Sequence, residues 1–129
     1  MLGHGKIDAT RDLIEAQIKS LGANRVDKAA TGKEGLLKLK KSLLEGIPYA
    51  LVTLDWEMPE MSGLELLKII RADEDLRSQL VLMVTSMATP EHLRQLVPLQ
   101  PSGYIVKPFT PELLKERIRN LLASEPGGG

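Results

Sequence analysis

Apolar residues follow a helical spacing in some segments of this chain and form continuous runs in others, and the two kinds of segment alternate. A first helix is predicted from four apolar residues that share one helical face and end just before Gly22, a common helix stop: Ile7, Ile14, Ile18 and Leu21. Four later helix starts are marked by a Thr or Ser with Glu three residues on, or with Pro directly after it: Thr31 with Glu34, Ser62 with Glu65, Thr89 with Pro90, and Thr110 with Pro111. The last of these helices is predicted to turn four apolar residues inward: Leu114, Ile118, Leu121 and Leu122.

The continuous apolar runs predict β-strands at residues 49–55 (YALVTLD), 80–86 (LVLMVTS) and 103–107 (GYIVK), and residues 25–30 form a short, weak strand. The first of these runs is apolar on both faces, which is typical of an internal strand in a parallel sheet. Because helices and strands alternate along the chain, the sequence predicts an α/β fold with a doubly wound sheet.

Composition narrows the class of protein further. The chain has 129 residues, enough for one domain, and its 17 basic residues balance its 17 acidic ones. We therefore expect residues 1–124 to form one domain with no nucleic-acid surface, followed by a flexible tail at 125–129. No apolar run is long enough to span a membrane, and the absence of cysteine suits a cytoplasmic chain.

Three polar residues end the apolar runs, and they form the candidate site. Asp55, Thr85 and Lys107 each stand at the carboxyl end of a predicted strand, where doubly wound sheets bind ligands. A carboxylate can attack a phosphoryl group, an ammonium can hold phosphate oxygens, and a hydroxyl can donate a hydrogen bond to them. Taken singly, each residue also has a purely structural explanation: a turn residue, a β-former and a solvated lysine.

Three stretches, LVTLDWEMPEMSGLELLKIIRA, VLMVTS and SGYIVKPFT, resemble the receiver domains of two-component response regulators, the CheY-like family. The resemblance covers roughly residues 7–123. It implies a (βα)5 fold of the flavodoxin/CheY-like type, with strand order 2-1-3-4-5 and a cis Lys107–Pro108 bond. It also implies that Asp55 accepts a phosphoryl group from a histidine kinase or phosphotransfer protein.

The same resemblance implies roles for the neighbouring residues. Lys107 becomes the phosphate-contacting lysine, Thr85 the switch hydroxyl, and Tyr104 the aromatic residue whose rotamer follows it. Asp55 and the backbone carbonyl of Glu57 become ligands of Mg²⁺, in a loop that Gly63 closes. Such a domain is not an enzyme and signals by binding a downstream protein partner.

The N-terminus departs from the family pattern. The first strand of a receiver domain ends in an acidic pair that binds Mg²⁺, but here Gly5 and Lys6 take those positions. We therefore expect a weakened Mg²⁺ site. We also expect either an unusually short first strand at residues 1–4 or a homodimer in which a second chain fills the gap. An alternative is that residues 1–6 are altered sequence.

Pro98 is a second departure, because it falls where the family's fourth helix should continue. We expect this helix, and the partner-binding surface that it forms, to be shortened. Two alternative functions remain open. One is a phosphorylation-independent adaptor, favoured by the missing acidic pair. The other is a small flavodoxin-like enzyme or nucleotide binder, although no Gly-rich phosphate loop follows any predicted strand.

Overall fold

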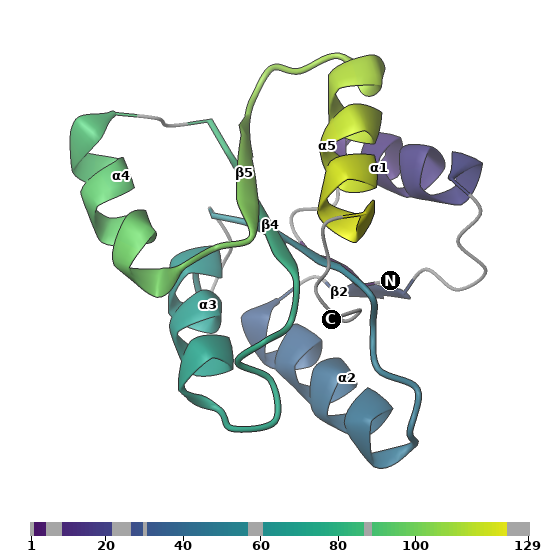
Figure 1. Ribbon diagram of the computed structural model, residues 1–129, viewed down its shortest axis with the longest axis vertical. Coiled ribbons are helices and arrows are strands. Elements are labelled where there is room, and N and C mark those ends of the chain that lie inside the picture. Colours follow the sequence, from purple (N-terminus) through teal and green to yellow (C-terminus); the bar gives the residue numbers. More distant parts are fainter. Residues whose placement is uncertain are drawn as a thin grey trace.

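Five parallel strands form one sheet in the order β2-β1-β3-β4-β5 (Figure 1). The computed structural model describes residues 2–4, 9–21, 27–29, 31–56, 61–86 and 89–123. The strands are β1 (Leu2–His4), β2 (Asp27–Ala29), β3 (Val52–Asp55), β4 (Val81–Thr85) and β5 (Gly103–Val106). The predicted α/β class and strand order are therefore confirmed. The predicted tail at residues 125–129 lies outside the described residues, as does Ile7.

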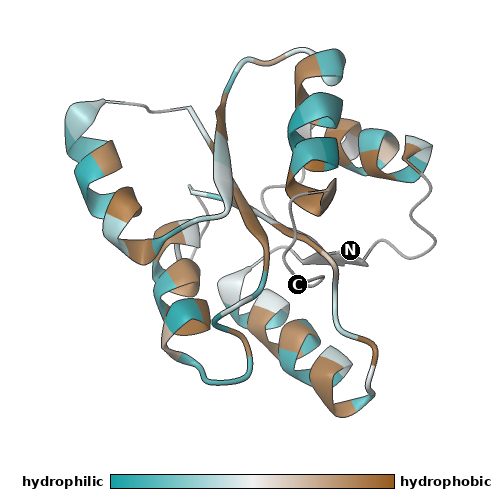
Figure 2. Cartoon of the chain, in the orientation of Figure 1, coloured by the Kyte–Doolittle hydropathy of each residue, from teal (hydrophilic) through white to brown (hydrophobic). Residues whose placement is uncertain are grey.

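Helices cover both faces of the sheet. They are α1 (Ala9–Ser20), α2 (Gly32–Leu44), α3 (Gly63–Ala72), α4 (Pro90–Leu96) and α5 (Pro111–Ala123), with a 3-10 turn η1 (Val97–Leu99) after α4. One apolar core joins the sheet to α1 and α5, and a second joins it to α2, α3 and α4. Figure 2 shows hydrophobic residues along the central strands, between these two helical layers.

The central strands are buried along their whole length, as their apolar runs predict. Every residue of β3 and β4 is buried. Neighbouring residues face opposite cores: Val52 and Leu54 of β3 belong to the core with α2, α3 and α4, whereas Leu51, just before β3, belongs to the core with α1 and α5. This two-sided packing fixes the orientation of Asp55, the last residue of β3.

Strand β1 is short, as predicted, yet it completes the sheet. Its three residues pair with β2 on one side and β3 on the other, with Gly3 in register with both Lys28 and Thr53. A second chain is therefore not needed to join β2 to β3. Of the two alternatives raised by the N-terminus, the short strand is the one that the structure contains.

The helix starts agree with the sequence signals. The side-chain oxygens of four residues accept hydrogen bonds from backbone N–H groups three residues on, and these residues are Thr31, Ser62, Thr89 and Thr110. Helix α4 ends at Leu96, and Pro98 lies in η1, so the predicted shortening is confirmed. One expectation was wrong: Leu122 does not face inward but is 36% exposed. It lies at the edge of the stripe formed by Leu114, Ile118 and Leu121, because its position on the helix is rotated away from theirs.

Arg71, in the last turn of α3, holds two connections together. Its guanidinium donates to the carbonyl oxygens of Arg77 and Gln79 in the α3–β4 connection, each at 2.9 Å. It also donates to Leu99 at 3.2 Å and to Gln100, which has a left-handed backbone (φ 51°) at the end of η1. Burial lowers the pKa of the Arg71 guanidinium from its ordinary value, but arginine stays charged at neutral pH.

The Arg71→Lys variant should lose about 2 kcal/mol of unfolding free energy, because one ammonium cannot replace a fork that reaches four carbonyl groups. Urea unfolding measures this loss. Arg77→Lys is the matched control, because the Arg77 side chain is exposed in the same connection. Equal midpoints for the two variants would show that the Arg71 fork does not stabilise the turn before β5.

Candidate functional site

Asp55 is held rigidly at the carboxyl edge of the sheet. Its residue is only 6% exposed. Trp56, the next residue, is held by two backbone hydrogen bonds. Its N–H donates to the Val84 carbonyl, and its carbonyl accepts from the N–H of Gly63, each at 3.0 Å. Strand β3 thus places the Asp55 carboxylate at the carboxyl edge of the sheet, and the chain leaves the sheet directly after this residue.

Lys107 is the direct partner of this carboxylate. Its Nζ lies 3.0 Å from Oδ2 of Asp55, and the two side chains are 24% and 8% exposed. The backbone N–H of Lys107 donates to the Thr85 carbonyl at 2.8 Å, which ties the end of β5 to the end of β4. The ammonium therefore compensates a carboxylate that is largely removed from water.

Thr85 and Tyr104 occupy the strands beside this pair. Thr85 is the last residue of β4 and is 2% exposed. Tyr104 lies in the outermost strand β5 and is 38% exposed. It lines a cavity of about 450 Å³ together with residues of α4 and η1, among them Leu93 and Val97. The structure thus brings Asp55 and Lys107 into contact, places Thr85 at the neighbouring strand end, and leaves Tyr104 on the surface.

The expected Mg²⁺ ligands are only partly within the described residues. Glu57 lies outside them, as do Gly5, Lys6 and Asp8. Within the described ranges, no group of three or more His, Cys, Asp or Glu side chains gathers as a metal site. Since Mg²⁺ prefers about six oxygen ligands, Asp55, the one expected ligand within the described residues, does not form a Mg²⁺ site by itself.

A contact between Trp56 and His92 was not anticipated from the sequence. The two rings meet edge to face, with centroids 5.3 Å apart and planes at 70°. Nδ1 of His92 also lies within hydrogen-bond distance of the Thr89 hydroxyl at the start of α4. The residue that follows Asp55 therefore touches the first turn of α4. The Thr89–Pro90 signal predicted the start of α4. No local sequence pattern indicates that His92 in this helix contacts the ring of Trp56.

The family model of the response regulator receiver domain matches residues 7–119. The chain belongs to this family. Chemotaxis protein CheY-3 of Vibrio cholerae is 40% identical over 108 residues, which cover 84% of this chain and 79% of that protein. Chemotaxis protein CheY of Pseudomonas aeruginosa is 34% identical over 111 residues, 86% of each chain. Among solved structures, a CheY-like receiver domain protein from Methanospirillum hungatei superposes with a TM-score of 0.81 at 28% identity, covering 99% of this chain and 97% of that one.

Gly63 shows why the receiver domain has a glycine where the loop after Asp55 meets α3. A Cβ atom on Gly63 would lie 2.9 Å from the carbonyl carbon of Asp55 and still closer to its oxygen. Both atoms belong to the backbone, so no side chain can move aside. The first residue of α3 is therefore packed directly against the peptide that carries the candidate phosphoacceptor.

Gly63→Ala should destabilise the receiver domain by about 3 kcal/mol, because the methyl group must displace the backbone at Asp55. The control is Gly103→Ala, where the nearest atom to an added Cβ is a flexible side-chain carbon of Leu121 at 3.4 Å. Urea unfolding of both variants measures the difference. A Gly63→Ala protein as stable as Gly103→Ala would mean that the close approach of α3 to Asp55 does not hold in solution.

Proposed function

We propose that Asp55 accepts the phosphoryl group in this receiver domain and that Lys107 and Thr85 bind it there. Receiver domains of this family act in two-component signalling, and they interact with histidine kinases and downstream partners. The observation that carries the assignment is the 3.0 Å contact between Lys107 and Asp55 at the carboxyl edge of the sheet. The proposed donor is a phosphohistidine of a histidine kinase or phosphotransfer protein.

In the proposed step, a carboxylate oxygen of Asp55 forms a bond to phosphorus while the phosphorus–nitrogen bond of the donor breaks. The products are an aspartyl phosphate and a donor histidine that takes up a proton from water. Phosphorylation replaces one negative charge by about two and adds acceptor oxygens. The Lys107 ammonium then pairs with the phosphoryl group instead of the free carboxylate, and the Thr85 hydroxyl donates to a phosphoryl oxygen.

The proposed output passes through β4 and β5. Thr85 and Lys107 are joined through their backbones, so a phosphoryl group that draws both side chains inward changes the ends of both strands. Tyr104, exposed beside the cavity under α4 and η1, is the proposed aromatic switch that follows Thr85. The shortened α4 changes the shape of the surface around this cavity, and we propose that the downstream protein partner binds to this surface.

Receiver domains typically bind Mg²⁺ in the active site. For this chain we propose a weak site in which the carboxylate of Asp55 and the carbonyl of Glu57 are the protein ligands, and in which the positive charge of Lys6, at a position of the family's acidic pair, lowers the affinity for the cation. The domain is proposed to span residues 1–124. Among the described residues, none of the helices combines the length and the apolar character that a membrane span requires.

Asp55 is tested by incubation with acetyl phosphate and Mg²⁺, followed by intact mass measurement. The wild type should gain one phosphoryl group, and Asp55→Asn should gain none, because an amide is not a nucleophile toward phosphorus. Asp75→Asn, at an exposed aspartate remote from the site, is the control and should be labelled like the wild type. Labelling of Asp55→Asn would disprove the assignment, and an unlabelled wild type would favour the phosphorylation-independent adaptor.

The Mg²⁺ site is tested by titration of Mg²⁺ against the wild type, Lys6→Ala and Lys6→Asp. The fluorescence of Trp56, the single tryptophan of the chain, reports binding next to Asp55. Lys6→Asp should bind Mg²⁺ at least about tenfold more tightly than the wild type, because it restores an anionic oxygen ligand, and Lys6→Ala should fall between them. Equal affinities in all three proteins would place the missing ligand elsewhere, with Asp8 the next residue to substitute.

A further inference from the structure

An exposed apolar stripe follows one side of α2 and the turn after it. Leu44 is 90% exposed, Leu37 is 69% exposed, and Ile47 is 53% exposed. Leu37 and Leu44 are seven residues apart, so they lie on the same side of the helix. Single exposed apolar residues are common on protein surfaces, but Leu44, the most exposed of the three, also lines a cavity, and apolar residues around a cavity are typical of an interaction site.

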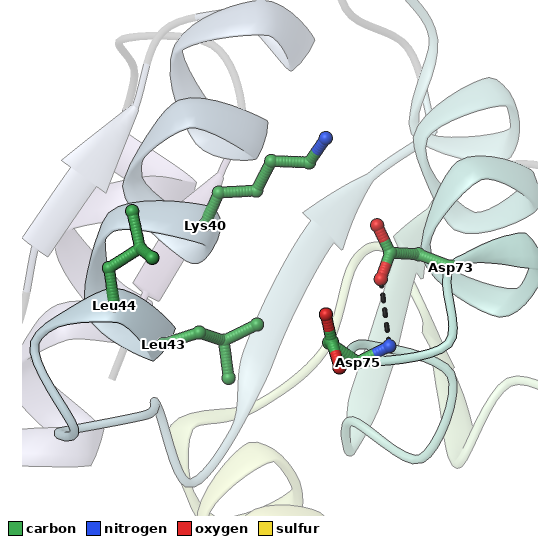
Figure 3. Close-up of a pocket in the computed structure, with 5 residues that line it drawn as sticks. All are labelled: Lys40, Leu43, Leu44, Asp73 and Asp75. Atoms are coloured by element: carbon green, nitrogen blue, oxygen red, sulfur yellow. Dashed lines mark hydrogen bonds between the residues drawn. The ribbon is translucent and has the colours of Figure 1, made fainter.

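Such a cavity lies between the C-terminal half of α2 and the connection that follows α3. It has a volume of about 530 Å³, and five residues line it: Lys40, Leu43, Leu44, Asp73 and Asp75. Figure 3 shows the two leucines on the α2 side and both aspartates on the opposite side. A second cavity of about 260 Å³ shares Leu43 and Asp75 and continues past Tyr49. We call the two cavities together the α2/α3 groove.

The carboxylates on the α3 side of the groove form no ion pair with the described residues. Asp73, Glu74 and Asp75 are consecutive, and Glu74 and Asp75 are exposed. One oxygen of Asp73 accepts the backbone N–H of Asp75 at 2.8 Å. Among the described ion pairs, none involves these three carboxylates or Lys40. The groove therefore has two leucines on its α2 side and the carboxylates of Asp73 and Asp75 opposite them, whereas Lys40 is the single lysine that lines it.

We propose that the α2/α3 groove docks a partner protein through a helical segment that carries a leucine-sized side chain next to an arginine or lysine. The apolar side chain packs between Leu43 and Leu44, and the basic side chain reaches the carboxylates of Asp73 and Asp75. Charge complementarity selects this occupant, because the carboxylates outnumber the ammonium in the groove. A segment with glutamate in the basic position meets like charge on the α3 wall.

The groove lies at the opposite end of the sheet from the candidate phosphorylation site. Tyr49 and Ala50, which precede β3, line its second cavity, whereas Asp55 ends that strand. Docking here leaves the Asp55–Lys107 pair and the cavity beside Tyr104 open. The proposed partner can therefore hold the receiver domain in both phosphorylation states, which goes beyond the proposed function and does not depend on it.

The test uses ¹⁵N-labelled protein and two alanine-based helical peptides of about 15 residues, each at about 1 mM. One peptide carries leucine with arginine four residues later on one face, and the other carries leucine with glutamate. The arginine peptide should shift the amide resonances of Leu43, Leu44, Asp73 and Asp75, and the glutamate peptide should leave them unchanged. No shift with either peptide, equal shifts with both, or shifts confined to another surface would overturn the proposal.

Two variants locate the contact, and both change exposed side chains, so that the fold is preserved. Asp75→Lys and Leu44→Glu should each weaken binding of the arginine peptide about tenfold or more. Glu112→Lys, an equivalent charge reversal at an exposed residue of α5, should bind the arginine peptide like the wild type. Unchanged binding in Asp75→Lys and Leu44→Glu would overturn the proposal. Concentration-dependent self-association that Leu44→Glu abolishes would also overturn the proposal, because the occupant of the groove would then be a second copy of this chain.

All three variants should still be labelled by acetyl phosphate. The outcome of the peptide-binding test is therefore independent of the test on Asp55.

Discussion

The ion pair between Asp55 and Lys107 imposes the main constraint on this structure. A carboxylate that is almost fully buried is unfavourable unless a cation and hydrogen bonds compensate it. The compensating ammonium comes from a residue 52 positions away, so it is in place only when β3, β4 and β5 are correctly paired. The continuous burial of β3 and β4 and the backbone bond from Lys107 to Thr85 satisfy this requirement. The charge compensation that Asp55 needs at one edge of the sheet is thus available only when the three strands are paired.

In the proposed function, the same pair is also the point at which phosphorylation acts. Since one ammonium balances one carboxylate, added phosphoryl charge at Asp55 changes the balance that holds Lys107 in place. We propose two routes for the signal outward from there. One runs through Thr85 and β5 toward Tyr104, and the other runs from Trp56 to His92 in the first turn of α4. The first ends at the cavity that Tyr104 lines together with residues of α4 and η1, and the second ends in the first turn of α4.

Local sequence signals predicted most of the fold. The apolar runs gave β3 and β4, because burial on both faces requires apolar residues at every position, and the capping residues gave the starts of α2, α3, α4 and α5. Features that depend on distant residues were not predictable in this way. The contact of Trp56 with His92, the fork of Arg71 and the close approach of Gly63 to Asp55 each join segments that only the folded sheet brings together. The wrong prediction for Leu122 has a local origin. A short apolar pattern along a helix does not define where the buried stripe ends.

Helix α3 runs from the candidate phosphorylation site to the α2/α3 groove and is fixed at both of its ends. Its first residue, Gly63, packs against the peptide of Asp55, and its last turn is fixed through Arg71 to the connections on either side of β4. A helix of this length is about 15 Å long, and it is held at its start by a backbone contact and in its last turn by the Arg71 side chain. It is therefore less able to shift than α4, which is short and ends in a 3-10 turn. In the proposed function, a change that starts at Asp55 therefore moves α4 and β5 more readily than α3, whose far end borders the α2/α3 groove.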